Sequence, residues 1–431
     1  MQRSRIKSHV ALLVVPALLV GGAVTAQDDD GMSLEGQDIV VSYMQSGTYD
    51  AAAADIAGAF TEETGANVEI IAQPFTVLNQ SYTTDLATGT GQFDFISATS
   101  WIADLFPQLL PLNDIYDPAD FPGYIPELLE PGRAPYNGDD LVGVPYAVDA
   151  YGVFYRTDLF EQAGVTADWT TWDEFYDTLA ELELTLEDDV SPMVFAYGAP
   201  EQVPAIFVAA YDGYYIDEND RFAVEPEAAA AALEHVLTGL DYSPDGATAL
   251  SIDEANAIFN EGKAAVLIGW PSFNRPAANA SEVTGGNWAL GSLPGPGFPW
   301  LSLWAGGIAG TSDVPEATYE WIKAYITPEL ATANMEKYGI GSPFASTYSD
   351  PALLEANAHD YPVQAANLAE AKNVAWTFPA FDAAWRSTGE MIVGNLTPEE
   401  TVQAWHDSWA TIDPPPASIA DAEALGLKQG S

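Results

Sequence analysis

The chain has 431 residues, no cysteine, and a formal net charge of −50 from 13 basic and 63 acidic residues. Without cysteine there can be no disulfide, thiolate metal site, cysteine nucleophile or lipidated N-terminal cysteine. The acidic residues are spread along the chain, and such a field repels nucleic acid, anionic lipid and polyanionic substrates but favours neutral or cationic ligands. We therefore expect no nucleic-acid partner. Dispersed acidity fits a saline habitat, although many exported proteins are simply acidic.

Residues 1–26 are predicted to be a secretory signal peptide. Arg3, Arg5 and Lys7 precede the apolar run VALLVVPALLVGGAV, and small residues follow it as a cleavage site. An uncleaved membrane anchor is the alternative, but a proline and glycines make this run a poor spanning helix, which needs about 20 apolar residues. We expect a secreted protein, and the missing lipid-bearing cysteine favours a free protein in a Gram-negative periplasm.

The mature chain begins with alternating strand and helix patterns. Its length, about 400 residues, exceeds what one hydrophobic core usually organises, so we expect two domains. DIVVSYM (38–44) and NVEIIAQ (67–73) have strand composition, and they flank an alanine-rich helix that Asp50 is expected to cap and Gly65 to end. FDFISA (93–98) is a third strand. Strand–helix–strand units of this kind predict an α/β fold.

Two helices are predicted within residues 155–182. Gly164 ends the first, and Thr171 with Glu174 forms the capping box of the second. The apolar residues of the second helix recur at helical spacing and should face a core: Trp172, Phe175, Leu179 and Leu182. These features predict a pair of helices packed on a sheet edge.

The remaining elements continue the alternation. Helices are expected at 225–240 and 252–262, from Pro315 onward, and from the capping box of Thr397 and Glu400 onward; a strand is expected at 263–270. The glycine- and proline-rich passage at 291–310 suits a crossover between domains.

Several passages, in this order, resemble the maltose-binding-protein-like family of extracellular solute-binding proteins that serve carbohydrate ABC transporters. The passages are GAFTEETGANVEI, FDFISATSWIADL, VGVPYAVDAYGVFYRTDLFEQAGV with TTWDEFYDTLAEL, FNEGKAAVLIGWP, AGGIAGTSDVPEATYEWIKAYIT, GIGSPFAS and LTPEETVQAWHDSW. The third is the most specific, because it is similar to the family's first interlobe crossing and the helices after it. The resemblance covers nearly all of the mature chain.

The resemblance implies a two-lobe periplasmic-binding-protein fold of type II, α/β in class. Each lobe would be a mixed sheet flanked by helices, and a hinge of two or three crossing segments would join them. The expected division is a signal peptide at 1–26, a flexible acidic segment at 27–37, lobe 1 at 38–148 and 303–342, lobe 2 at 149–302 and 343–420, and a tail at 421–431.

Candidate ligand-binding residues follow from strand ends and from the resemblance. Gln45 follows the first strand, and Ser100 and Trp101 follow the third, where ligands gather in open α/β sheets. The family's cleft positions add seven more: Asp149, Tyr151, Trp270, Trp304, Phe381, Trp385 and Arg386. Aromatic faces stack on the C–H faces of sugars while polar groups bond the hydroxyls. Each aromatic residue could instead belong to the core, and Asp149 could make a hinge hydrogen bond.

The expected function is the capture of a mono- or oligosaccharide between the lobes of a monomer, for delivery to the permease subunits of an ABC importer. A polyamine or other small solute is the alternative within the same fold. A secreted glycoside hydrolase is the alternative from another class, because Asp149 and Asp382 could form a carboxylate pair. We expect no enzyme, because nucleophile and phosphate-loop motifs are missing. No cofactor and no metal is expected, because His235, His359 and His406 are isolated.

Overall fold

The computed structural model describes residues 33–99, 105–126, 128–129, 140–372, 376–412, 426 and 428–429. The predicted signal peptide at 1–26, most of the acidic segment at 27–37 and most of the tail at 421–431 lie outside these ranges. The candidate site residues Ser100 and Trp101 also lie outside them. Among the described helices, none combines the length and apolar character that a membrane span requires.

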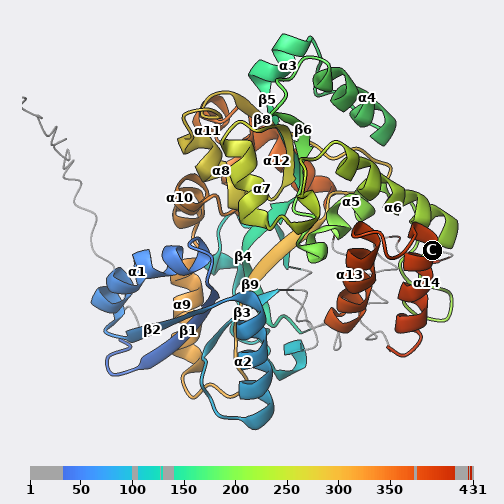
Figure 1. Ribbon diagram of the computed structural model, residues 1–431. Helices are drawn as coiled ribbons and strands as arrows, with labels where there is room; N and C mark the ends of the chain where they lie inside the picture. The colour runs from blue at the N-terminus through green and yellow to red at the C-terminus, as the bar shows by residue number, and fades with distance from the viewer. Residues whose placement is uncertain are drawn as a thin grey trace, which may run out of the picture.

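A five-stranded mixed sheet organises the first lobe (Figure 1). Its strands are β1 (Asp38–Met44), β2 (Asn67–Gln73), β3 (Phe95–Thr99), β4 (Gly143–Ala150) and β9 (Leu301–Ile308), in the order β2-β1-β3-β9-β4. β1 runs parallel to β2 and β3, whereas β9 lies antiparallel between β3 and β4. The predicted strand–helix–strand unit is confirmed, because α1 (Tyr49–Thr64) connects β1 to β2.

β9 is a strand that sequence reasoning treated only as part of a glycine-rich crossover. Two of its residues are Gly306 and Gly307, and glycine weakens a strand in a sequence pattern. The structure shows why glycine is needed here: a Cβ on Gly306 would lie 2.6 Å from the ring of Phe95 on the neighbouring strand. The glycine therefore permits close packing and does not interrupt the sheet.

The helices of the first lobe cover its sheet on both sides. They are α1, α2 (Phe75–Thr88), α9 (Pro315–Tyr325) and α10 (Pro328–Tyr338), with a 3-10 turn η2 (Pro118–Asp120). Gly65 ends α1 in the left-handed conformation as predicted, but Asp50 does not cap it. The helix begins at Tyr49, two residues earlier than expected, so Asp50 lies in its first turn. Its carboxylate accepts a weak hydrogen bond from the Ser46 amide at 3.3 Å.

A four-stranded sheet organises the second lobe. Its strands are β5 (Gly152–Arg156), β6 (Ser191–Val194), β7 (Ala264–Gly269) and β8 (Trp288–Gly291), in the order β6-β7-β5-β8. Its helices are α3 (Thr157–Ala163), α4 (Trp172–Glu183), α5 (Pro204–Ala210), α6 (Pro226–Asp241), α7 (Ile252–Asn260), α8 (Pro271–Ala280), α12 (Tyr361–Glu370), α13 (Phe378–Ile392) and α14 (Pro398–Trp409). Shorter pieces are η4 (Pro200–Gln202), η5 (Ala247–Ala249), η6 (Ala345–Tyr348) and α11 (Pro351–Ala356).

The capping signals read from the sequence fix helix starts in the second lobe. Thr171 and Glu174 form the predicted capping box of α4, and Thr397 and Glu400 form that of α14. The four predicted core residues of α4 are all buried. α13 and α14 lie side by side at one end of the lobe, and α14 packs against α6 (Figure 1).

Three segments cross between the lobes, in agreement with the expected hinge. The first is the link from β4 to β5 at residues 150–152, the second leads into β9 at 299–301, and the third is 339–343 after α10. The Val148 amide donates to the Gly341 carbonyl at 3.1 Å, which ties the third crossing to the first. A Cβ on Gly341 would lie 1.8 Å from the Val148 carbonyl oxygen, so only glycine fits there. The exact lobe boundaries stay a prediction.

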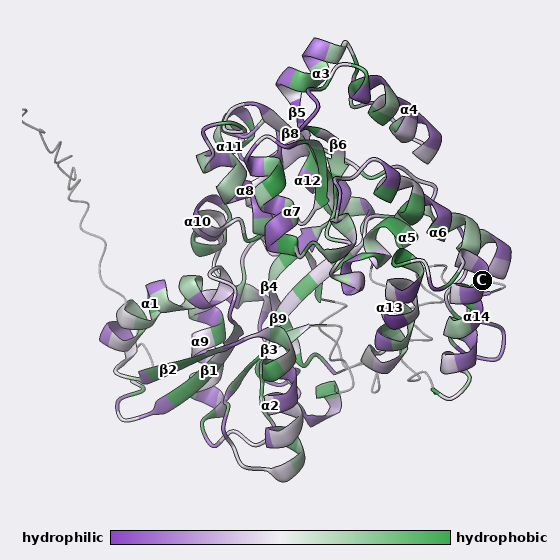
Figure 2. Cartoon of the chain, viewed as in Figure 1, coloured by the Kyte–Doolittle hydropathy of each residue, from purple (hydrophilic) through white to green (hydrophobic). Residues whose placement is uncertain are grey.

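Each lobe has its own apolar interior. Figure 2 shows hydrophobic strands inside helices whose outer faces are hydrophilic. The larger cluster lies in the second lobe and is rich in aromatic residues, including Trp172, Trp300, Trp376, Trp405 and Trp409. Most of the described tryptophans therefore contribute to core packing. Core packing is the alternative role that we considered for the aromatic residues in the sequence analysis.

Candidate functional site

The polar and aromatic candidates of the first lobe lie at one edge of its sheet. The parallel strands β1 and β3 end at this edge. Thr99, the last residue of β3, pairs with Trp304 of the antiparallel strand β9. Trp304 also pairs with Ala147 of β4, so β4 ends at the same edge. Gln45 follows β1 and is exposed. We call this region, where the three crossings also leave the first lobe, the hinge edge. It is the edge at which open α/β sheets bind ligands.

Trp304 lies in an aromatic group at the hinge edge that helices of the first lobe complete. Its ring centroid is 5.3 Å from that of Tyr49 and 6.0 Å from that of Phe75. Tyr49 begins α1 and Phe75 begins α2, so two helix starts converge on the tryptophan. Phe273 on α8 of the second lobe lies 6.5 Å from Tyr49. Aromatic residues of the two lobes therefore meet here.

Tyr151 and Trp270 are neighbours because of the register of the second sheet. Gly152 pairs with Gly269, which places the residue before β5 beside the residue after β7. The two ring centroids are 4.0 Å apart, with the planes inclined at 46°. The Tyr151 hydroxyl donates to Oε1 of Gln202 at 2.7 Å, and Nε1 of Trp270 donates to the same oxygen at 2.8 Å. One amide oxygen thus holds both rings.

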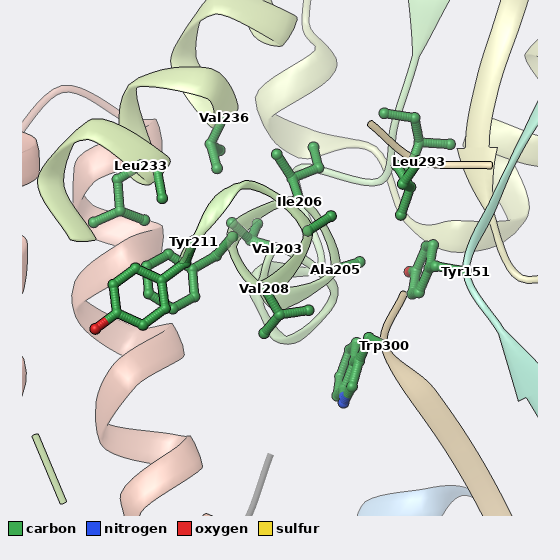
Figure 3. Close-up of a cluster of buried hydrophobic side chains, with 14 of the residues drawn as sticks. Tyr151, Val203, Ala205, Ile206, Val208, Tyr211, Leu233, Val236, Leu293 and Trp300 are labelled. Carbon is green, nitrogen blue, oxygen red and sulfur yellow. The ribbon is translucent and has the colours of Figure 1, made fainter. Parts of the chain in front are cut away.

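Trp300 extends this pair into what we call the aromatic row, defined as Trp270, Tyr151, Trp300 and Phe381. The Trp300 ring lies 6.1 Å from Tyr151 with nearly parallel planes, and 5.4 Å from Phe381 at 26°. Figure 3 shows Tyr151 and Trp300 beside the apolar residues of α5. Trp385 meets Phe381 edge to face at 4.9 Å. All four members of the row are at most 5% exposed.

Asp149 is buried at the first crossing and accepts hydrogen bonds from both lobes' elements. Its carboxylate accepts from the Ser272 amide at the start of α8 (2.8 Å), from Nε2 of Gln364 on α12 (2.9 Å) and from the Ala150 amide (3.0 Å). Burial raises the pKa of Asp149 to about 6, although the hydrogen bonds from Ser272 and the charge of Arg275 oppose that rise. Both carboxylate oxygens are engaged within the chain.

Arg275 anchors α8 beside Asp149. Its guanidinium forms a two-pronged ion pair with Asp360, in which Nε contacts one carboxylate oxygen and Nη2 lies 3.1 Å from the other. Nη1 donates to the Gly339 carbonyl at the third crossing, at 2.9 Å. Both side chains of the pair are at most 3% exposed. We define the hinge cluster as four side chains: Arg275, Asp360, Asp149 and Gln364.

The sequence-predicted site residues thus separate into groups. Asp149, Tyr151 and Trp270 come together at the first crossing, and Phe381 and Trp385 join the latter two through Trp300. Arg386 is exposed and its side chain bonds that of Asp382, one turn earlier on α13, at 2.7 Å. Ligand binding by these residues stays a prediction.

Gln202, Trp300 and Tyr49 are residues of this region that sequence reasoning missed. Trp300 follows Pro299 in the glycine- and proline-rich passage 291–310, whose composition is typical of a crossover. The one sequence signal for Trp300 was its position four residues before Trp304. Gln202 lies in the sequence APEQVP, which carries no motif. Its two aromatic partners are 51 and 68 residues away, so the chain offered no local signal.

The three histidines within the described residues serve packing. His235 stacks on Trp172, His359 meets Trp288 edge to face, and Nε2 of His406 accepts from the Val224 amide. Burial lowers the pKa of each. Over the described residues, no group of three or more histidine, aspartate or glutamate side chains is arranged to hold a metal ion.

Two cavities lie in the second lobe away from the aromatic row. One of about 390 Å³ lies between α6 and α14 and is lined by Ala230, Val402 and His406 among others. The other, of about 200 Å³, lies beside Tyr211, Phe298 and Lys372. Neither is lined by a residue of the hinge edge, so neither defines the predicted interlobe site.

The geometry and the sequence together define a class of protein: two α/β lobes, three crossings, and aromatic residues of both lobes at the hinge edge. The family described as "Bacterial extracellular solute-binding protein" matches residues 45–332, and the chain belongs to this family. Solute binding for an ABC transporter is the family's role, which confirms the predicted family, fold class and binding role. The family is one of binding proteins and not of enzymes.

Individual proteins similar to this chain bind sugars or sugar alcohols. The mannitol-binding protein of Pseudomonas aeruginosa is 26% identical over 304 residues, 65% of this chain and 67% of that protein. Maltose-bound MalE3 of T. maritima superposes with a TM-score of 0.76 at 21% identity, covering 86% of this chain and 99% of that one. A ribitol complex from Agrobacterium radiobacter K84 gives 0.75 at 20%, covering 88% and 99%. At these identities the structures show the fold alone.

Proposed function

We propose that this protein captures a neutral sugar or sugar alcohol in the cleft between its lobes and delivers it to the permease of an ABC importer. The observation that carries the proposal is the convergence of two aromatic groups on the hinge edge. One is Trp304 with Tyr49 and Phe75, and the other is the aromatic row. Ring faces suit the C–H faces of a polyol, and the mannitol-binding relative supports that ligand class.

Capture would follow from closure of the lobes. A ligand that contacts both lobes binds the closed form better than the open one, and this difference in affinity shifts the population toward closure. A permease could then recognise the closed form. In this proposal lobe 1 comprises 38–148 and 303–342, lobe 2 comprises 149–302 and 343–420, and the protein acts as a monomer in the periplasm.

The proposed ligand-binding residues are those of the sequence analysis, with a distinction drawn from their contacts. Gln45, Ser100, Trp101, Trp304, Tyr151, Trp270, Phe381, Trp385 and Arg386 are assigned to the ligand. Asp149 is assigned to the hinge, because its carboxylate is already bonded to Ser272, Gln364 and Ala150. This assignment also removes one member of the carboxylate pair that a hydrolase would need.

Calorimetric titration with D-mannitol, ribitol, maltose and spermidine tests the proposed function. We expect one of the first three to bind, to raise the melting temperature through linkage, and to change tryptophan fluorescence. Replacement of Trp270 by Ala should weaken binding by about 1–3 kcal/mol, because a stacking face is lost. Binding of spermidine alone would favour the polyamine alternative, and hydrolysis of maltose above a blank would overturn the binding role.

A further inference from the structure

Gln202 occupies a central place in the region that we assign to the ligand. It ends the short turn η4 between β6 and α5 and is 4% exposed. Its Oε1 accepts the Tyr151 hydroxyl at 2.7 Å and the Trp270 indole at 2.8 Å. Among the residues that the structure describes, no other side chain is hydrogen-bonded to two members of the aromatic row. Among the side chains that the structure describes, Gln202 is therefore the polar link within that row.

The partners of Gln202 determine which way its amide points. An indole Nε1–H is a donor only, so the amide atom facing Trp270 must be the oxygen. The Tyr151 hydroxyl contacts the same oxygen and must therefore donate to it. Two donors use both lone pairs of a carbonyl oxygen. The amide orientation is thus fixed by chemistry, and Nε2 is directed away from the two rings.

The Nε2 hydrogens of Gln202 are the donors that remain at this point. Over the described part of the chain, no acceptor is bonded to them, whereas Oε1 is fully used. The Trp270 N–H is engaged with Gln202, so this indole has no donor left for a ligand. The Tyr151 phenol stays neutral, because burial raises its pKa well above the usual value. The region therefore combines aromatic rings with an amide N–H₂ that has no acceptor among the described residues.

We propose that Gln202 is a specificity-determining residue that holds Tyr151 and Trp270 in place and donates from Nε2 to a hydroxyl oxygen of a neutral polyol or sugar. This inference rests on the proposed function and adds the selection against cationic solutes. An amide N–H₂ can donate a hydrogen bond to a hydroxyl oxygen. It cannot bond an ammonium group, because both groups are donors. The nearby carboxylate of Glu201, whose charge is felt at Tyr151, would by itself attract a cation. The Gln202 amide thus opposes the preference for cationic ligands that the Glu201 carboxylate would create.

Gln202→Glu is the sharpest test, because its carboxylate can still accept from both rings. The variant replaces the Nε2 donor by an acidic oxygen, and measurement at pH 8 keeps that carboxylate ionised. We expect the free variant to keep the wild-type tryptophan emission. We expect its affinity for the polyol or sugar that binds the wild type to fall tenfold or more. The ratio of spermidine affinity to polyol affinity should rise by at least the same factor.

Gln162→Glu serves as the matched control, because it adds the same charge at an exposed position on α3, far from the hinge edge (Figure 1). It should leave both affinities within twofold. Gln202→Met removes the two ring contacts as well and should also shift the tryptophan emission. An unchanged polyol affinity in Gln202→Glu would overturn the inference while the proposed function stands, and so would an equal loss for both ligands. A wild type that binds none of the three polyols and sugars would overturn both.

Discussion

The aromatic row and the hinge cluster are both buried at the same crossing, yet they are stabilised in different ways. Tyr151 of the row and Asp149 of the cluster are only two residues apart in sequence. The row consists of ring faces, and a single amide oxygen satisfies the polar atoms of two of its members. The cluster consists of charged and amide groups whose bonds connect the first crossing, α8, α12 and the third crossing.

This difference suggests separate tasks for the two regions. Aromatic rings lose little stabilising free energy when a ligand replaces a neighbouring protein surface, because dispersion and apolar burial are not directional. A buried ion pair tolerates no such exchange, since a charge left without its partner is strongly unfavourable. We therefore interpret the hinge cluster as the fixed part of the joint and assign the aromatic row to ligand binding, as proposed above.

Arg275→Met should produce the largest effect, because it removes the cation of the hinge cluster and leaves Asp360 buried without its partner. We expect the free energy of unfolding to fall by about 3–5 kcal/mol, measured by urea denaturation. Arg386→Met is the matched control. It breaks an exposed pair with Asp382 on one helix and should cost no more than about 0.5 kcal/mol. Equal losses in the two variants would contradict the contrast between buried and exposed pairs.

The titration of Asp149 provides a second, smaller test of the hinge cluster. Burial raises its pKa to about 6 in the folded protein, from an ordinary value of 3.8. Between these values the folded state holds a proton that the unfolded state has released. The stabilising contribution is therefore complete below pH 4 and is lost as the pH rises to 6, by on the order of 3 kcal/mol.

The measurement compares the wild type with Asp149→Asn, which cannot titrate. Arg275, Gln364 and Ser272 face the carboxylate in both proteins, and all other carboxyl groups are the same. The wild-type free energy of unfolding minus that of the variant should decrease between pH 4 and pH 6.5. A difference that increases over this range would show that the folded state prefers the charged carboxylate.

The sequence was most informative where the determining interactions are local. The capping boxes at Thr171 and Thr397, the left-handed Gly65 and the strands β1 and β2 each depend on residues a few positions apart. The family resemblance then supplied the two-lobe arrangement. Asp50 shows the limit even of local reasoning, because α1 begins before this residue and has no side-chain cap.

The interactions of the candidate site are not local, and for that reason the sequence did not reveal them. Arg275 and Asp360 are 85 residues apart, and 63 acidic residues offered equally plausible partners. The hinge role of Asp149 depends on Ser272 and Gln364, which are 123 and 215 residues away. A pattern could nominate Trp270 as an aromatic residue at a strand end. It could not identify the amide that orients the ring.

Tyr151→Phe is the smallest change that separates the two regions. It keeps the ring, and Gln202 retains the bond from the Trp270 indole, so only one hydrogen bond of the aromatic row is lost. We expect the free energy of unfolding to fall by about 0.5–1.5 kcal/mol. Because the hinge cluster keeps every contact, the pH dependence assigned to Asp149 should not change. A changed pH profile would mean that the aromatic row and the hinge cluster act as one network, despite their different chemistry.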